Sequence, residues 1–275
     1  MSPDTAADGL WRLADGVLAT VAKASRRVMD IYHTDFQVQR KPDGSPITSA
    51  DLAAHEIISE GLGSLEPGVP IVSEEGEIPA FVERSSWRQY WLVDPLDGTR
   101  GFAARSGEFT VNVALVSDAE PVLGVVAVPV CGTSYAAVHA GGARLVHADG
   151  VRRSIHTRRL CHQQVVVLRS RTRRHADVDR LIAKLGKVRV MRASSSLKAC
   201  LVARGLADLY PAFGPTSEWD TAASQCLLEE AGGALTDLSL QPLRYNRSAS
   251  MENPAFIAVG DARADWKNLL ADLDS

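Results

Sequence analysis

The sequence predicts an α+β protein whose second half is an α/β unit. Three observations lead to this prediction. Residues 6–33 carry apolar side chains at helical spacing, residues 109–138 hold short valine-rich segments, and strand-like and helix-like segments alternate from residue 161 onward. Helical spacing indicates an amphipathic helix, valine-rich segments with short turns indicate antiparallel strands, and regular alternation indicates an α/β unit.

The first half begins with the long helix of residues 6–33. A short strand is expected at residues 36–40, followed by turn residues up to Pro46. Thr48 stands three residues before Asp51, which is the spacing of a capping box. We therefore expect a helix from about Ser49 to Leu65.

The remaining elements are predicted from β-branched runs and from helical spacing. Strands are expected at residues 69–72, 90–93, 109–116, 122–130, 134–138, 151–155, 165–168, 188–191 and 207–210. Helices are expected at residues 176–185, 195–203 and 221–231. The change of rhythm predicts two subdomains, an N-terminal α+β subdomain of residues 1–158 and a C-terminal α/β subdomain of residues 159–275.

Bulk composition excludes several classes of protein. Hydrophobic residues make up 45% and charged residues 23% of the 275 residues, as in ordinary globular proteins. No apolar run reaches the ~18 residues of a membrane span. The first residues lack the pattern of a signal peptide, so a cytoplasmic location is expected, with peripheral association with the inner membrane left open. The four cysteines form no CxxC pair, which argues against a cysteine zinc site, and we expect them to be buried thiols.

Positive charge is concentrated in one stretch. The net charge is −3, yet residues 144–192 hold 14 basic and 3 acidic residues. This stretch is either a solvated face or a site for a polyanion. A non-catalytic nucleic-acid binder is therefore an alternative, although the overall negative charge and the absence of a visible nucleic-acid motif argue against it.

Two aspartates three residues apart follow the predicted strand at residues 90–93. Asp94 and Asp97 lie in the segment Asp-Pro-Leu-Asp-Gly-Thr, where Pro95 fixes φ and Gly98 permits a tight bend. Crowded carboxylates repel one another unless a cation neutralises them, and hard oxygen ligands suit Mg²⁺ or Mn²⁺. The alternative is a turn that caps a helix.

Three further acids are candidates for the same site. Glu74 follows a short strand, whereas Asp51 and Asp220 each stand where a helix begins. A carboxylate at a helix start can cap the helix and bind a metal ion at once. We predict that these three acids converge with the two aspartates of the turn.

These motifs resemble the inositol monophosphatase superfamily. The resemblance rests on the Asp-Pro-Leu-Asp-Gly-Thr motif, the earlier Ser-Glu-Glu segment at 73–75 and the later Trp-Asp-Thr-Ala-Ala segment at 219–223. Segments 195–198 and 210–216 resemble its CysQ-type branch, the 3'(2'),5'-bisphosphate nucleotidases. The resemblance covers roughly residues 10–260. It implies a layered α/β/α/β/α sandwich of the sugar-phosphatase type, with the active site between two subdomains.

The resemblance also implies a role for particular residues. It implies two or three Mg²⁺ ions per site, with Mn²⁺ as a substitute, inhibition by Li⁺, and metal ligation by Glu74, Asp94, the Leu96 carbonyl, Asp97 and Asp220. The implied catalytic residues are Asp51, Thr99 and Glu74, which position or deprotonate the attacking water. The implied substrate-binding residues are Gly98, Thr99, Ser195, Ser196, Lys198, Arg171 and His175. Arg173 and Arg174 of the basic stretch are further candidates for binding a second phosphate.

The predicted activity is removal of the 3'-phosphate from adenosine 3',5'-bisphosphate (PAP) to give AMP, and the same reaction on its sulfated form, PAPS, to give APS is left open. Inositol monophosphate and fructose 1,6-bisphosphate are alternative substrates within the superfamily. The expected partner is a small nucleotide, without nucleic acid and without stable membrane insertion. A homodimer is left open.

Overall fold

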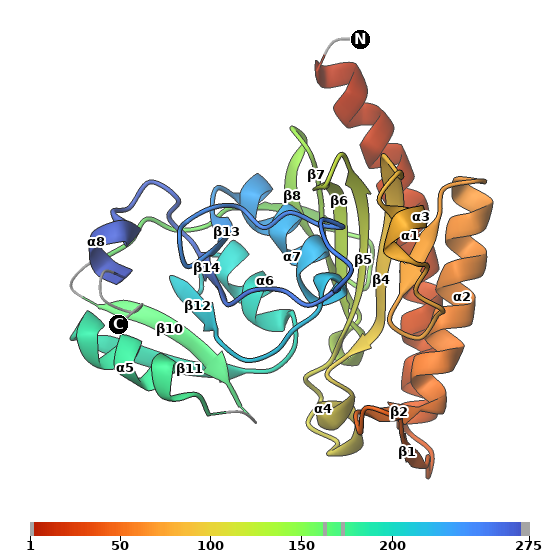
Figure 1. Cartoon of the computed structure of the whole chain (residues 1–275), viewed down its shortest axis with the longest axis horizontal. Helices are drawn as coiled ribbons and strands as arrows, with labels where there is room; N and C mark the ends of the chain where they lie inside the picture. The colour runs from red at the N-terminus through yellow and green to blue at the C-terminus, as the bar shows by residue number, and fades with distance from the viewer. Residues whose placement is uncertain (1–2, 162–163, 172–173, 271–275) are drawn as a thin grey trace.

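The computed structural model describes residues 3–161, 164–171 and 174–270. Within these residues the strands form a seven-stranded, a five-stranded and a two-stranded sheet. The two larger sheets alternate with three layers of helices (Figure 1). This arrangement confirms the predicted layered α/β/α/β/α sandwich.

The first helical layer covers the outer face of the seven-stranded sheet. It consists of α1 (Pro3–Tyr32) and α2 (Ser49–Leu65) (Figure 1). Val17, Val21 and Val28 of α1 are fully buried in a core that also contains Val113 of the sheet. Both predicted helices are confirmed, and α2 begins and ends at the expected residues.

The seven-stranded sheet has the order β3-β4-β5-β6-β7-β8-β9. Its strands are β3 (Ile71–Ser73), β4 (Gln89–Asp97), β5 (Thr110–Ser117), β6 (Glu120–Val128), β7 (Thr133–Val138), β8 (Gly142–Val146) and β9 (Arg152–Ile155). All neighbours are antiparallel except β3 and β4. The expected strand at 122–130 ends earlier, because Pro129 begins the short 3₁₀ helix η1 (Pro129–Cys131).

β13 (Ala234–Asp237) and β14 (Phe256–Val259) of the second half were not expected from the sequence, and neither were two strands of the first half. β8 is one, and the other is β2 (Pro46–Thr48), which pairs with β1 (Val38–Arg40) in a small hairpin. Both have three to five residues and lie among turn residues, so their apolar signal is weak. The short helices α3 (Phe81–Arg84) and α4 (Thr99–Ala103) complete the first half.

The middle layer holds α6 (Leu197–Ala203) and α7 (Glu218–Ala231) between the two large sheets (Figure 1). α7 is buried on most of its surface, and one core cluster contains residues from α7 and both sheets. A Cβ added at Gly124 of β6 would lie 2.4 Å from the carbonyl oxygen of Ala223 in α7. The close approach of this helix to the sheet therefore requires glycine.

The five-stranded sheet has the order β11-β10-β12-β14-β13. Its strands are β10 (Val165–Ser170), β11 (Val188–Ala193), β12 (Leu209–Ala212), β13 (Ala234–Asp237) and β14 (Phe256–Val259). The helices α5 (Ala176–Leu185) and α8 (Trp266–Leu270) form the last layer. The predicted subdomain boundary at 158/159 lies in the connection between the two sheets, and it stays a prediction because the sheets share a core.

Two further expectations have a clear outcome. Among the described residues, no helix combines the length and apolar character needed to span a membrane. The expectation of four buried thiols is wrong for two of them. Cys200 and Cys226 are buried in the middle layer, whereas Cys131 and Cys161 are exposed because they lie in connections between strands.

Candidate active site

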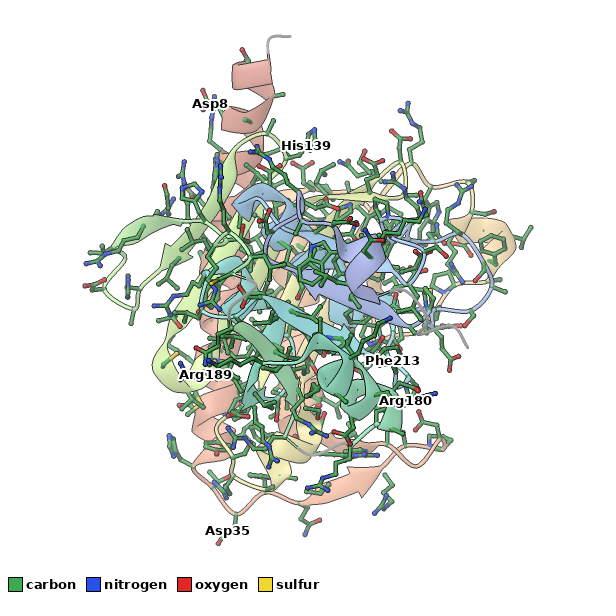
Figure 2. All side chains as sticks on the ribbon, turned by 90° about the vertical axis from the view of Figure 1, so that its left-hand side faces the viewer. Asp8, Asp35, His139, Arg180, Arg189 and Phe213 are labelled. Atoms are coloured by element: carbon green, nitrogen blue, oxygen red, sulfur yellow. The ribbon has the colours of Figure 1, made fainter. Side chains whose placement is uncertain are left out.

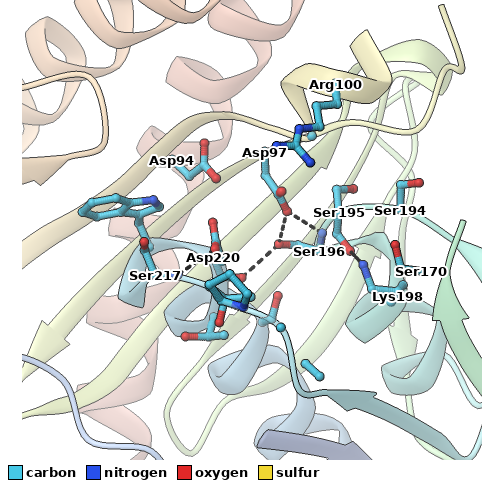
Figure 3. A pocket seen from close by; sticks show the side chains of 18 of the residues that line it. Asp94, Asp97, Arg100, Ser170, Ser194, Ser195, Ser196, Lys198, Ser217 and Asp220 are labelled. Carbon is cyan, nitrogen blue, oxygen red and sulfur yellow. Dashed lines mark hydrogen bonds between the residues drawn. The ribbon is translucent and has the colours of Figure 1, made fainter. Parts of the chain in front are cut away.

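A cavity of about 910 Å³ lies between the two large sheets. It is lined by the end of β4, the segment before α6 and the start of α7, so residues from both halves of the chain face it (Figure 3). Its lining includes Glu74, Asp94, Asp97 and Asp220. Four of the five predicted acids therefore border one cavity.

Asp94 is the most deeply buried of these acids. Its side chain lies where the regular register of β4 against β5 ends, and Asp94 is 1% exposed. The Leu96 amide donates to Oδ1 at 3.0 Å, whereas Oδ2 has no hydrogen-bond partner among the described residues. Burial, followed by the charges of Glu74, Asp97 and Asp220, raises the pKa of Asp94 well above its usual range.

Asp97 and Asp220 complete a group of three carboxylates with Asp94. One oxygen from each of the three lies within 4.8 Å of the others. Asp220 is the third residue of α7 and accepts a hydrogen bond from the Ser217 amide at 2.8 Å, so it completes a capping box instead of being the N-cap itself. Burial and the neighbouring Asp97 raise the pKa of Asp220.

Glu74 lies beside this group but turns toward a lysine. Its backbone amide donates to Val93 of β4 at 3.1 Å, which places Glu74 next to Asp94. Its carboxylate lies 2.9 Å from Lys41 Nζ, and Lys41 also contacts Glu75 at 2.7 Å. Lys41 thus neutralises part of the negative charge at this end of the cavity.

Asp51 reaches the site through Thr99. The Thr99 hydroxyl lies 3.1 Å from Asp51 Oδ1 and 3.2 Å from the Leu96 carbonyl oxygen. The other carboxylate oxygen of Asp51 accepts from the amide and the hydroxyl of Thr48 at 2.8 and 2.6 Å. The capping box of α2 therefore holds Asp51 in the orientation that contacts Thr99.

The acidic group suits a divalent cation. Ionising a buried carboxylate is costly where an oxygen lacks a partner, and Asp94 Oδ2 has none among the described residues, so a bound cation would offset this cost. Carboxylate and carbonyl oxygens are the ligands that hard cations prefer. Asp94, Asp97 and Asp220 could therefore hold a metal ion.

Ser195, Ser196 and Lys198 also line the cavity, and Ser196 lies next to the acidic group. The Ser196 amide and hydroxyl donate to Asp97 Oδ2 at 2.6 and 2.8 Å (Figure 3). Lys198 is buried, and its Nζ donates to the Ser195 carbonyl at 2.7 Å and lies 4.7 Å from the centre of the Tyr210 ring. Gly98 has φ +94, which only glycine adopts readily, and a Cβ added there would lie 3.4 Å from Ser195 Cβ.

Of the residues predicted to bind substrate in the 170–175 segment, some line the cavity and others do not. His175 lines the cavity and stacks on Phe213 with ring centroids 5.6 Å apart, and Arg174 also lines the cavity. Arg171 is not among the lining residues, and its guanidinium forms two hydrogen bonds to Glu108 at 2.6 and 2.9 Å. Arg173 lies outside the described residues. Substrate contacts by Arg171 and His175 stay predictions.

Part of the basic stretch is compensated by acids, three of them from other segments and two from the stretch itself. Arg180 and Arg189 are exposed on the side of the molecule formed by α5 and the five-stranded sheet (Figure 2). Five arginines, Arg180 among them, are paired: Arg152 with Asp15, Arg158 with Asp208, Arg169 with Asp179, Arg171 with Glu108 and Arg180 with Asp177. This pattern favours a solvated face over a polyanion-binding surface.

Three residues at the site were not predicted as functional. Lys41 neutralises Glu74, Phe213 stacks on His175, and Asn112 donates to Ser196 at 2.8 Å. Asn112 carried a signal in the sequence, because it is a lone polar residue in the apolar strand of residues 109–116. Phe213 carried a signal too, because it lies in segment 210–216, which supports the resemblance to the CysQ-type branch, whereas Lys41 lies in a turn where lysine is common and nothing set it apart.

Comparison with known proteins agrees with this geometry. The model of the inositol monophosphatase family matches residues 12–269. CysQ of Escherichia coli K12, a 3'(2'),5'-bisphosphate nucleotidase, is 43% identical over 248 residues, which is 89% of this chain and 98% of that relative. CysQ of Haemophilus influenzae is 35% identical over 94% of this chain and 96% of its own length.

Solved structures give the same result. The crystal structure of CysQ from Bacteroides thetaiotaomicron superposes with a TM-score of 0.79 at 36% identity, covering 91% of this chain and 97% of that one. SuhB of Bartonella henselae has the same fold, with a TM-score of 0.76 at 23% identity over 95% of this chain and 99% of its own. The chain belongs to the inositol monophosphatase family.

Proposed function

We propose that this chain is a 3'(2'),5'-bisphosphate nucleotidase that removes the 3'-phosphate of PAP and leaves AMP. The observation that carries the proposal is the 43% identity to E. coli CysQ over 98% of that relative's length. The structure supports the proposal because the acidic group borders a cavity of about 910 Å³. A cavity of this size has room for a nucleotide.

We further propose Mg²⁺ as the cation, held by Glu74, Asp94, Asp97, Asp220 and the Leu96 carbonyl. When bound, Mg²⁺ would supply an activated water and neutralise charge on the leaving oxygen. Thr99 donates to Asp51, so its oxygen is free to accept a hydrogen bond from that water. Burial raises the pKa of Asp51, which makes this carboxylate a stronger proton acceptor.

Substrate recognition is assigned to residues that line the cavity beside the acidic group. The amides of Gly98 and Thr99 would bind the phosphate that is cleaved. Lys198, Arg174 and His175 line the cavity and would face the second phosphate and the nucleoside. Lys198→Ala should therefore raise KM for a bisphosphate more than for a monophosphate, whereas equal increases would remove its role in selectivity.

A substrate panel tests the proposal. Purified protein is given PAP, PAPS, inositol 1-phosphate and fructose 1,6-bisphosphate in Mg²⁺, and phosphate release and nucleotide products are measured. We expect the highest kcat/KM for a 3'-phosphorylated nucleotide, with AMP as the product from PAP. Faster hydrolysis of the inositol ester would overturn the proposed specificity.

The metal is tested in the same assay. Chelation should abolish turnover, Mg²⁺ should restore it, Mn²⁺ should substitute, and Li⁺ should inhibit. An enzyme that stays active after complete chelation contradicts the metal proposal. A cytoplasmic location and a homodimer are also proposed, to be checked by cell fractionation and analytical ultracentrifugation.

A further inference from the structure

A chain of hydrogen bonds connects the seven-stranded sheet to the start of α6 at a carboxylate of the acidic group. Asn112 lies within β5 of the seven-stranded sheet and is 1% exposed. Its Nδ2 donates to Ser196 Oγ at 2.8 Å, and Ser196 is the N-cap of α6 in the second half of the chain. From Ser196, two hydrogen bonds continue to Asp97 Oδ2. Figure 3 shows Ser196 between Asp97 and Asp220.

The hydrogen bonds in this series all run in one direction, from Asn112 through Ser196 to the acidic group. A serine hydroxyl carries one hydrogen and can accept with its lone pairs. Because Asn112 donates to this hydroxyl, the hydrogen of Ser196 points away from Asn112. It is then directed to Asp97 Oδ2 at 2.8 Å or to the Asp220 carbonyl oxygen at 3.0 Å. Both acceptors belong to residues of the acidic group.

The same contacts distinguish the two oxygens of Asp97. The Ser196 amide donates to Oδ2 at 2.6 Å, and the Thr110 hydroxyl contacts the same oxygen at 3.4 Å. Among the described residues, every hydrogen bond found to this carboxylate ends on Oδ2. Oδ1 is thereby left to face the cavity and a cation, and the orientation of the carboxylate is fixed.

We infer that Ser196 and Asn112 are positioning residues for Asp97, and that Ser196 acts on the metal site instead of on the substrate. The inference deepens the proposed function, on which its catalytic readout rests. Hydrogen-bond partners of metal ligands fix ligand orientation, and their loss typically weakens metal affinity by about 10–100-fold. A substrate contact would instead change KM for the nucleotide.

The test measures metal affinity without substrate. Mn²⁺ binding is followed by electron paramagnetic resonance or by calorimetry for wild type, Ser196→Ala, Asn112→Ala and the double variant. We expect each single variant to raise the Mn²⁺ Kd by roughly tenfold. The double variant should be no weaker than Ser196→Ala alone, because Asn112 acts through the Ser196 hydroxyl.

Two further variants serve as controls. Ser196→Thr keeps the hydroxyl and should bind Mn²⁺ more tightly than Ser196→Ala, as expected when one donor replaces another. Ser25→Ala removes a buried serine hydroxyl that has no partner among the described residues, and it lies in α1 far from Asp97 in the chain. It should leave the Mn²⁺ Kd unchanged. Melting temperatures identify any variant that is simply unfolded.

Three outcomes would overturn the inference. They are an unchanged Mn²⁺ Kd in Ser196→Ala, additive losses in the double variant, and a raised KM for PAP at saturating metal without a change in metal affinity. The last would make Ser196 a substrate contact. If wild type fails to hydrolyse PAP but Ser196→Ala still loses Mn²⁺ affinity, the proposed substrate fails and the positioning role stands.

Discussion

Asp94 is where burial and charge oppose each other most strongly. The carboxylate is fully buried, one of its oxygens lacks a partner among the described residues, and three acids contribute to its raised pKa. In the absence of a cation, an ionised Asp94 destabilises the folded state. The same repulsion favours binding of a divalent cation. Function and metal-free stability should therefore respond in opposite directions when this charge is removed.

Asp94→Asn tests that opposition. Activity with PAP should fall at least about a hundredfold, since even a partner of a metal ligand typically contributes 10–100-fold. The melting temperature in chelator should rise, at roughly 2–4 °C for each kcal/mol of repulsion removed. Scanning calorimetry and initial rates provide the two measurements. Near-normal kcat in saturating Mg²⁺ would contradict the role of Asp94 as a metal ligand.

Buried acids also predict the effect of pH on the metal-free protein. Burial raises the pKa of Glu75 and of Glu218 to about 7, and it raises the pKa of Asp51. An acid with a raised folded-state pKa binds more protons when folded, so stability falls as pH rises from its unfolded pKa, about 4, through its folded pKa. In chelator we expect the melting temperature to be higher at pH 5.5 than at pH 8. A stability maximum near pH 8 would contradict this expectation.

The roles of single residues were predictable where neighbouring positions in the sequence form a recognisable motif. The spacing of Asp94 and Asp97 indicated a metal site because both carboxylates leave one turn. The contact of Asn112 with Ser196 joins residues 84 positions apart, and no local pattern encodes such a pair. The same holds for Arg171, whose pairing with Glu108 spans 63 positions.

At the scale of elements, two helices carry in their first turn an acid that also belongs to the candidate active site. In α2 the Thr48 amide donates to Asp51, and in α7 the Ser217 amide donates to Asp220, each at 2.8 Å. A capping box fixes the side chain of its third residue relative to the helix axis. The first turn of each helix therefore determines where its carboxylate meets the cavity.

Thr48→Ala tests this coupling in α2. The variant loses the hydroxyl that donates to Asp51 at 2.6 Å, so it should cost about 1 kcal/mol in the free energy of unfolding. It should also lower kcat by several-fold, because Asp51 is less firmly held against Thr99. Thr34→Ala is the matched control, since that hydroxyl bonds the Ile31 carbonyl at the end of α1. A loss of stability without any loss of kcat would separate the cap from catalysis.

Elements with a strong periodic signal were predicted well. α2 and α5 begin and end at the expected residues, because capping residues and apolar spacing agree there. The strand expected at residues 90–93 is longer, because β4 continues to Asp97 with a shift of register. Its last residues pair with β5 although Pro95 interrupts the apolar pattern. Long-range pairing, which the local sequence does not specify, decided this boundary.

At the scale of the whole molecule, the site depends on how closely the layers pack. Asp94 and Asp97 belong to the seven-stranded sheet, Asp220 to α7 and Ser196 to the start of α6. The acidic group therefore forms only when the middle layer is seated against the sheet. The sequence predicted the layers through family resemblance, but it did not indicate which residue allows the close contact.

Gly124→Ala tests the seating of α7 on the sheet. The new Cβ would lie 2.4 Å from the Ala223 carbonyl oxygen and 3.0 Å from its Cα, and backbone atoms cannot rotate away. Overpacking of this kind typically costs about 1–3 kcal/mol, which denaturant unfolding would measure. Because α7 carries Asp220, the Mn²⁺ Kd should rise as well. Gly63→Ala is the control, since a Cβ there meets nothing within 4 Å in the helix α2, and it should stabilise the protein by about 0.5–1 kcal/mol. If Gly124→Ala lowered stability but left metal affinity intact, α7 would tolerate displacement without moving Asp220, and the dependence of the site on this contact would be disproved.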